Sequence, residues 1–169
     1  MIHIYQRHCN VSSNSVGKSR PEWFSREGCF QNLLKTTSKH KNIKITIMFD
    51  GEPNKDHFIN KYNSDFYELV KREGGDDARS FLNVVNYVAE QNLPEDDIVY
   101  FLEDDYMHTH NWVDTMLEGF NQMSLDYLEY IFGGLLYLIS SKFREKKKNK
   151  WNNESYTYKI YEVGMWITM

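Results

Sequence analysis

Cysteine, net charge and long apolar runs are all scarce in this chain of 169 residues. The two cysteines, Cys9 and Cys29, do not have the spacing of a metal-ligand pair. Two thiols in a chain of this length are expected to be ordinary reduced residues. A net charge of −4 gives no strong electrostatic reason to bind nucleic acid. The longest apolar run, 130–139, is too short to span a bilayer, and the first residues lack a signal-peptide pattern. We therefore expect a cytoplasmic protein with no transmembrane segment and no nucleic-acid partner.

The apolar content predicts a folded chain. Hydrophobic residues make up 41% of the sequence and aromatic residues 15%, which is enough for a buried core in a chain of this length. We expect a single domain over residues 1–169, because no internal repeat or interdomain linker is found in the sequence.

Hydrophobic periodicity predicts that strands and helices alternate along the first two-thirds of the chain. Strands are expected at 2–5, 43–49, 66–70 and 98–102. Helices are expected at 21–35, 55–62, 80–91 and 113–123. The first helix is expected to follow a capping box that begins at Ser19 and to bury an apolar face that includes Trp23. This order of elements predicts an α/β fold whose mostly parallel central sheet is flanked by helices.

The last third of the chain is less regular. Residues 127–139 are expected to form one or two strands, 142–150 a solvated loop or helix, and 156–163 a late strand. Three tryptophans are expected to be core residues rather than a platform for a sugar: Trp112, Trp151 and Trp166.

The apolar run at 98–102 leads directly into three acids, Glu103, Asp104 and Asp105. Such a run is typical of a strand buried on both faces, and open α/β sheets bind their ligands at the carboxyl ends of such strands. Side chains 103 and 105 share one face of an extended segment, so their oxygens suit Mg²⁺ or Mn²⁺ together with a substrate phosphate. The alternative is a solvated acidic loop or an acidic helix start.

Other charged residues are expected near the same edge of the sheet. Asp50 ends its strand and is either a contact for a base or ribose or the first residue of an Asp-Gly turn. Asp76, Asp77 and Arg79 precede a helix. There they either contact a phosphate or base edge, or the two acids simply cap the helix.

Two further pairs of residues are weaker candidates. Lys18 and Arg20, in or beside the loop after the first strand, could serve a diphosphate, although surface charges are frequent in such loops. His108 and His110 follow the acids closely enough to ligate a metal or pack against a sugar, but we expect them to be solvated loop histidines.

Four stretches occur together within residues 2–122. They are the first strand with its loop, Phe49-Asp50-Gly51, the segment Gly-Asp-Asp-Ala-Arg-Ser-Phe at 75–81, and Val-Tyr-Phe-Leu-Glu-Asp-Asp-Tyr at 99–106. Together they resemble nucleotide-sugar-dependent glycosyltransferases of the GT-A fold, particularly family-2-like enzymes of bacteria and large DNA viruses. The resemblance implies a Rossmann-like domain, in the host cytoplasm if the source is viral. Residues 1–122 would bind the nucleotide sugar, and 123–169 would form a divergent acceptor side.

The resemblance also implies an activity and a set of site residues. The activity is metal-dependent transfer of a sugar from a nucleoside-diphosphate donor of the UDP or GDP type to a hydroxyl of a glycan or protein acceptor. Asp105 and Glu103 would hold Mn²⁺ or Mg²⁺. The nucleotide would be bound by a second group of residues: Asp50, Asp77, Arg79, Asp104 and Arg7.

The chain departs from this resemblance in its last third. No Asp or Glu there lies in a recognisable motif for the base that deprotonates the acceptor, so the catalytic residue is unknown. The chain is also short for the fold, which makes a C-terminally truncated, weak or inactive transferase an alternative. A nucleotide-sugar-binding protein without turnover is another alternative, and a metal-dependent phosphohydrolase or nuclease is a less favoured one.

Overall fold

The computed structural model describes residues 1–11, 17–62, 64–122 and 160–161. These residues divide into two compact units, one that runs to His110 and includes Tyr161, and one that begins at Asn111. The first unit contains the central sheet. The second unit contains the helix α3 (Trp112–Gln122), which confirms the helix expected from the apolar spacing after residue 111. None of the described helices is long and apolar enough to cross a membrane.

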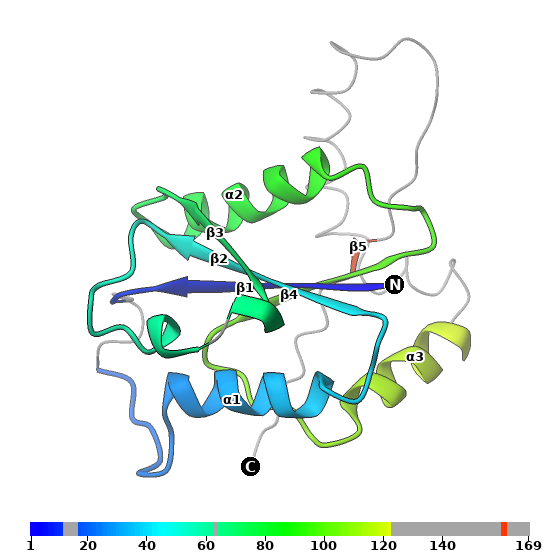
Figure 1. Cartoon of the computed structure of the whole chain (residues 1–169), viewed down its shortest axis with the longest axis horizontal. Coiled ribbons are helices and arrows are strands. Elements are labelled where there is room, and N and C mark those ends of the chain that lie inside the picture. Colours follow the sequence, from blue (N-terminus) through cyan, green and yellow to red (C-terminus); the bar gives the residue numbers. More distant parts are fainter. Residues whose placement is uncertain (12–16, 63, 123–159, 162–169) are drawn as a thin grey trace, which may run out of the picture. The chain divides into compact units, whose positions relative to one another are not determined.

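A parallel sheet forms the centre of the first unit (Figure 1). Its four long strands among the described residues are β1 (Ile2–Cys9), β2 (Ile43–Asp50), β3 (Glu68–Arg72) and β4 (Ile98–Glu103). Their order in space is β3-β2-β1-β4, and the two-residue strand β5 (Ile160–Tyr161) follows β4. Ile2 pairs with Ile43 on one side and with Ile98 on the other. The expected α/β fold with a parallel sheet is therefore confirmed.

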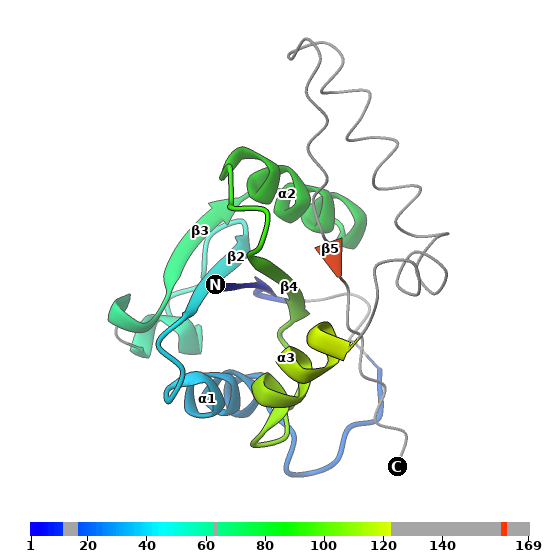
Figure 2. The same cartoon turned by 90° about the vertical axis from the view of Figure 1, so that its right-hand side faces the viewer.

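Helices cover both faces of this sheet. The two long helices, α1 (Arg26–Thr37) and α2 (Asp77–Glu90), lie on opposite faces (Figures 1 and 2). Two short 3₁₀ helices, η2 (Phe58–Lys61) and η3 (Ser64–Phe66), connect β2 to β3, so the helix expected at 55–62 is present as a single tighter turn.

Aromatic rings fill the space between the sheet and its helices. Phe30 of α1 packs against Phe58 of η2 with 5.9 Å between the ring centroids. On the other face, Phe81 of α2 packs edge-on against Phe101 of β4 at 5.8 Å. The middle of β1, β2 and β4 is buried between these layers. The continuous apolar runs of these strands reflect burial on two faces, as expected for a parallel sheet.

Helix α1 begins later than the sequence predicts. Ser25 is its N-cap, and the Ser25 Oγ accepts a 2.9 Å hydrogen bond from the Gly28 amide. The residues before it form a turn in which the Phe24 amide donates to the Pro21 carbonyl, so the capping box from Ser19 is wrong. Trp23 lies outside the helix and is 61% exposed, so it is not part of the apolar face.

The other elements differ from prediction mainly at their ends. Strand β1 is longer than expected because the polar residues Gln6 and His8 are buried in it, which the alternation rule does not anticipate. Strand β3 and helix α2 are shifted from 66–70 and 80–91 by up to three residues. Trp112 is buried as expected, whereas Trp151, Trp166 and the elements expected at 127–139 and 142–150 lie outside the described residues. Of the strand expected at 156–163, residues 160–161 are described, as β5.

The loop from β3 to α2 passes close to the backbone of α2 at Gly74. A Cβ added there would lie 2.8 Å from the Ser80 amide nitrogen and 3.2 Å from Asp50 Oδ2. The Ser80 amide is part of the first turn of the helix, since it donates to the Asp76 carbonyl at 2.9 Å. The Ser80 amide and the Asp76 carbonyl cannot move without disturbing the start of α2.

The substitution Gly74→Ala is therefore expected to lower the free energy of unfolding by about 1–3 kcal/mol, because the added methyl overpacks this loop. Urea denaturation followed by circular dichroism measures the change. Gly119→Ala is the control, since Gly119 lies inside helix α3, where alanine is favoured by up to about 1 kcal/mol. Equal stability of Gly74→Ala and the parent protein would contradict the close approach.

Candidate functional site

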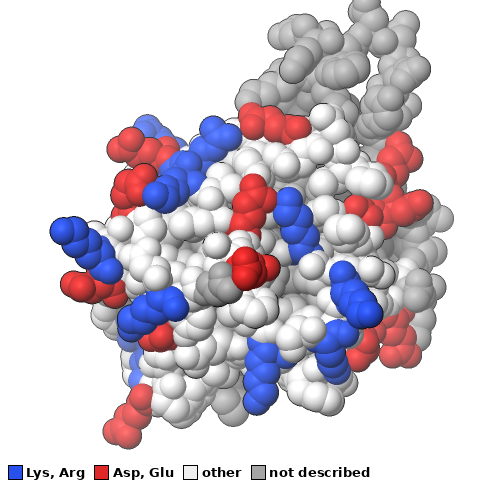
Figure 3. Space-filling view, viewed as in Figure 1, with Lys and Arg blue, Asp and Glu red and all other residues white. Residues whose placement is uncertain are grey.

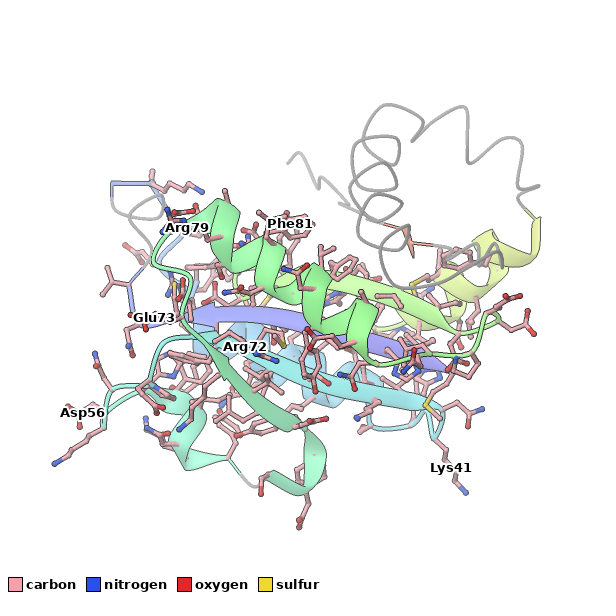
Figure 4. The ribbon with its side chains drawn as sticks, turned by 90° about the horizontal axis from the view of Figure 1, so that it is seen from above. Lys41, Asp56, Arg72, Glu73, Arg79 and Phe81 are labelled. Carbon is pink, nitrogen blue, oxygen red and sulfur yellow. The ribbon has the colours of Figure 1, made fainter. Side chains whose placement is uncertain are left out.

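The carboxyl ends of the parallel strands meet at one edge of the sheet. The strand order reverses between β1 and β4, because β2 and β3 extend the sheet on one side of β1 and β4 lies on the other. In open α/β sheets such a reversal leaves a crevice in which ligands bind. Figure 4 shows Glu73 and Arg79 at this edge and Lys41 at the opposite end of the sheet. Acidic and basic side chains are interspersed over the face seen in Figure 3.

Each acid of the predicted cluster is paired with a different arginine. Arg7 Nη2 lies 2.5 Å from Glu103 Oε1. Arg20 Nη2 lies 2.5 Å from Asp105 Oδ2. Arg26 Nη1 lies 3.4 Å from Asp104 Oδ2. The cation that three adjacent carboxylates need is supplied here by three guanidinium groups, which come from β1, from the segment before α1 and from α1 itself.

Arg7 joins three elements of the fold. In addition to its contact with Glu103, its Nη1 donates a 2.9 Å hydrogen bond to the backbone carbonyl of Asp77. Its guanidinium lies over the ring of Phe81, 5.7 Å from the centroid. Arg7 therefore links the end of β4 to the first turn of α2, and its side chain is mostly buried.

Asp104 and Asp105 do not continue the extended strand. Strand β4 ends at Glu103, and the next two residues form a turn. The pKa of the buried Cys29 thiol is raised to about 11, mainly by burial and further by the negative charges of Asp105 and Asp104. They therefore lie near α1, whereas Glu103 meets Arg7 near α2. The prediction that side chains 103 and 105 share one extended face is wrong, because the alternation of a strand ends where the strand does.

Asp104 is the buried member of the three acids. Burial raises the pKa of its carboxyl group to about 7, because the charged form loses hydration; Arg26 opposes this shift, and Asp105 and Glu103 add to it. Arg26 Nη1 also donates to the Cys9 carbonyl at 3.2 Å, which fixes the guanidinium at the end of β1. Asp104 is therefore buried beneath the carboxyl ends of the strands, whereas Glu103 is exposed to solvent.

Two polar side chains of β1 are fully buried beside these acids. His8 lies with its Nδ1 4.0 Å from Asp104 Oδ2, and its ring stacks on Phe49. Burial, with His57 and Arg26 nearby, lowers the pKa of His8 to about 3. Within the described residues, neither ring nitrogen of His8 has a hydrogen-bond partner, and the same holds for Gln6 Oε1. Gln6 Nε2 donates to the Glu103 carbonyl at 3.2 Å.

The sequence did not predict Gln6, His8 or Arg26 as part of this edge. The available signal was the pattern Gln6-Arg7-His8 directly after an apolar strand start, since polar residues that continue a central strand need partners at its end. The position of Arg26 at this edge could not be predicted from the sequence, because a basic residue at the start of a helix does not by itself indicate a partner.

Asp50 stabilises a loop. Its Oδ1 accepts hydrogen bonds from the Gly74 amide at 2.7 Å and from the Gly75 amide at 3.2 Å. Gly75 has a φ of +78°, which favours glycine at that position. Asp50 therefore holds the loop between β3 and α2 against the end of β2. A nucleoside that contacted Asp50 would meet a carboxylate that also accepts hydrogen bonds from this loop.

The acids before α2 behave as helix-capping residues. Asp76 is the N-cap, and its Oδ1 accepts a 2.8 Å hydrogen bond from the Arg79 amide. The Arg79 side chain is exposed and lies 3.4 Å from Asp76 Oδ2. Asp77 follows in the first turn and meets Arg7 through its backbone carbonyl. The capping alternative is confirmed for Asp76, and Arg79 stands at the rim of the edge.

The two histidines after the acids differ from each other. His108 is half-buried, and its Nε2 lies 3.1 Å from the Tyr100 hydroxyl. Asn32 of α1 accepts from the His108 amide at 2.7 Å and donates to its carbonyl at 3.1 Å. Burial lowers the pKa of His108 to about 4. The expectation of a solvated loop histidine is wrong for His108, which joins the loop after β4 to α1, and right for His110, which is exposed.

The exposed acids could each serve one kind of divalent-cation site. The described part of the chain has no group of three or more His, Cys, Asp or Glu side chains that could enclose a metal ion. Mg²⁺ and Mn²⁺ commonly keep waters and use one or two carboxylates together with substrate phosphates. Glu103, which is exposed, and Asp105, which is partly exposed, could supply such carboxylates. Either carboxylate could therefore serve a cation that arrives with a phosphate ligand, and the described residues provide no complete set of ligands for a metal alone.

No protein-family model, curated protein or solved structure gives a significant match to this chain. Any assignment of function therefore depends on the chemistry of this edge.

The raised pKa of Asp104 predicts a specific dependence of stability on pH. Between the ordinary value of 3.8 and about 7, the unfolded chain loses the proton that the folded protein keeps, so stability falls as the pH rises through this window. Asp104→Asn stays neutral and should remove the fall, gaining roughly 2–4 kcal/mol on the parent between pH 4 and pH 7.

Urea denaturation at several pH values measures this difference. The control is Asp56→Asn, which replaces an exposed carboxylate and should keep the slope of the parent protein. Parallel curves for Asp104→Asn and the parent would show that Asp104 is ionised at no cost in the folded state.

Proposed function

We propose that this chain binds a nucleoside-diphosphate sugar at the carboxyl edge of its sheet and, with a divalent cation, transfers the sugar to an acceptor hydroxyl, as GT-A glycosyltransferases do. The observation that carries the proposal is the meeting of Arg7, Arg20 and Arg26 with three consecutive carboxylates where the strand order reverses. Guanidinium groups match the geometry of phosphate oxygens, and carboxylates match a hard cation.

The position of these groups supports a nucleotide ligand. The order β3-β2-β1-β4 is that of the first half of a doubly wound nucleotide-binding sheet, in which the ligand lies across the reversal. The start of α2, with Asp77 and Arg79, lies beside this reversal because Arg7 ties it to β4. Amides at a helix start favour anionic groups. A donor of the UDP or GDP type could therefore place its diphosphate beside Arg7 and the end of β4.

Each residue has a distinct role under this proposal. Asp105 is the first candidate to hold the cation, and Glu103, whose carboxylate lies on the α2 side with Arg7, is the second; the cation would neutralise charge on the leaving diphosphate. Arg7 and Arg20 hold the phosphates. Asp104 keeps Arg26 at the end of β1, while Asp50 acts on the nucleoside side by fixing the loop at 74–75. The acceptor would be a hydroxyl of a glycan or protein.

The proposal predicts that Asp105→Ala abolishes Mn²⁺-dependent binding of uridine diphosphate, because the cation loses a carboxylate ligand. Isothermal titration calorimetry with and without Mn²⁺ measures the affinity. Asp56→Ala, which removes an exposed carboxylate, is the control and should bind as the parent does. An unchanged affinity of Asp105→Ala would exclude Asp105 as a metal ligand.

One observation favours a second candidate function, binding of a nucleotide sugar without turnover. A base for the acceptor needs a carboxylate that can take up a proton. Three acids of the edge are already engaged: Asp50 accepts from loop amides, Glu52 pairs with Lys71 at 2.6 Å, and Asp76 caps α2.

Release of the nucleoside diphosphate separates the two functions. A transferase with Mn²⁺ and a panel of UDP- and GDP-sugars should release UDP or GDP over hours at high protein concentration, and the release should be lost in Asp105→Ala. A rise in melting temperature with the same sugars but no release would favour the binding protein. If the sugars neither raise the melting temperature nor are cleaved to release UDP or GDP, both functions are excluded.

A further inference from the structure

Strand β3 is an edge of the central sheet. It pairs with β2 on one side, and no described strand pairs with its other side (Figure 2). The Gly51 amide donates a 3.0 Å hydrogen bond to the Arg72 carbonyl, so the backbone groups of Arg72 face β2. Because consecutive residues of a strand direct these groups to opposite sides, the N–H and C=O groups of Leu69 and Lys71 face away from β2. Such an edge is a template for pairing with another strand.

The charged side chains of β3 lie over the faces of the sheet and leave this edge open. Lys71 Nζ lies 2.6 Å from Glu52 Oε2 of the same chain. The Arg72 guanidinium lies 5.9 Å from the centroid of the Tyr87 ring, and the Tyr87 hydroxyl donates to Glu68 at 3.0 Å. Glu68 and Arg72, at the two ends of the strand, therefore lie on the same face, the one covered by α2.

The sequence of β3, Glu-Leu-Val-Lys-Arg at 68–72, is complementary to itself. In an antiparallel pair of two copies centred on Val70, Glu68 of each copy is opposite Arg72 of the other. The hydrogen-bonded pairs in this register are Leu69 with Lys71, the residues whose backbone groups face outward. A two-fold axis through Val70 repeats every contact, as in most symmetric dimers.

Neighbouring two-fold registers lack this match of charge. A pair centred on Lys71 would place two lysines directly opposite each other, and a pair centred on Leu69 would place Glu68 opposite Val70. Opposite charges across a strand pair stabilise it, and like charges destabilise it. Phe66, which directly precedes the strand segment, is 65% exposed, so an apolar ring also flanks this edge.

We propose that two copies of this chain associate through β3, antiparallel and centred on Val70, so that one sheet continues across the dimer. The complementary charges and the outward backbone groups identify a second copy of the chain as the partner. This association is separate from the proposed function, because it uses no residue of the acid–arginine pairs. The contact is short, so the dimer is weak and its population depends on concentration.

Sedimentation velocity of the full chain at increasing concentration should show a reversible monomer–dimer equilibrium. Lys71→Pro removes an outward N–H but no hydrogen bond between β2 and β3, and should raise the dissociation constant of the dimer at least about 10-fold. Lys71→Gln is the matched control. It also loses the pair with Glu52 but keeps the N–H, so it should dimerise as the parent does.

Cross-linking tests the register. Val70→Cys should form a disulfide between two copies under mild oxidation, because the Cα atoms of such an opposed pair are only about 4.5 Å apart. Leu69→Cys should not, since residue 69 is opposite Lys71 of the second copy. Non-reducing gel electrophoresis measures the product, and the parent protein, which has the same free Cys9 and Cys29, gives the background.

Reversal of charge tests the end pairs. Arg72→Glu places like charges opposite each other at both ends and should raise the dissociation constant roughly 5- to 30-fold. Adding Glu68→Arg restores opposite charges and should return the constant to within about 3-fold of the parent value. Lys41→Glu, which makes the same change of net charge at the exposed far end of the sheet (Figure 4), is the control and should leave it unchanged.

Each outcome supports or overturns the dimer. A chain that stays monomeric at all concentrations overturns it, and so does a dimer that Lys71→Pro does not weaken, because another surface then forms it. Cross-linking through Leu69→Cys in place of Val70→Cys overturns the register. Circular dichroism of each variant confirms that it is folded. Weaker association of folded Lys71→Pro together with the Val70→Cys disulfide supports the proposal.

Discussion

The pairing of β1 with both β2 and β4 is the constraint on which the rest of the structure depends. Because these strands are parallel, their carboxyl ends lie at one edge, and residues far apart in the sequence meet there. Arg7 near the end of β1 can reach Glu103 only because the two strands are in this register, in which Arg7 and Glu103 are directly opposed. Burial of the aromatic layers on both faces stabilises this pairing.

Electrostatics at that edge follow from the same geometry. Three adjacent acids would repel one another, and arginines from three different segments compensate their charges. The compensation is uneven, since Asp104 is buried enough for its pKa to rise to about 7 although Arg26 is close. His8 beside it is held neutral by burial. Among the described residues this edge also retains buried polar atoms without hydrogen-bond partners, namely the ring nitrogens of His8 and Gln6 Oε1.

Much of the fold could be predicted from local patterns. The apolar run at 98–102 and the alternation at 43–49 predict β4 and β2 because side-chain burial follows the period of the backbone. The start of α1 could not be predicted as well. Ser19 and Ser25 are both good caps by type, and the turn from Pro21 to Phe24 decides between them. The burial of His108 is not predicted for a related reason, since its partners Asn32 and Tyr100 are distant in the sequence or on another element and form no local pattern with it.

The sequence by itself determined the kinds of groups at the site: an α/β alternation, acids at the end of a buried strand, and acids and a basic residue before a helix. Only the tertiary structure decided which of them meet. Arg7 and Glu103 are 96 positions apart, and Arg20 and Asp105 are 85 apart. Local periodicity carries information over a few turns or one strand, whereas partners at such separations are selected by strand register and by packing of helices on the sheet. The change from an acidic cluster that needs a cation to one already matched by arginines is a consequence of that selection.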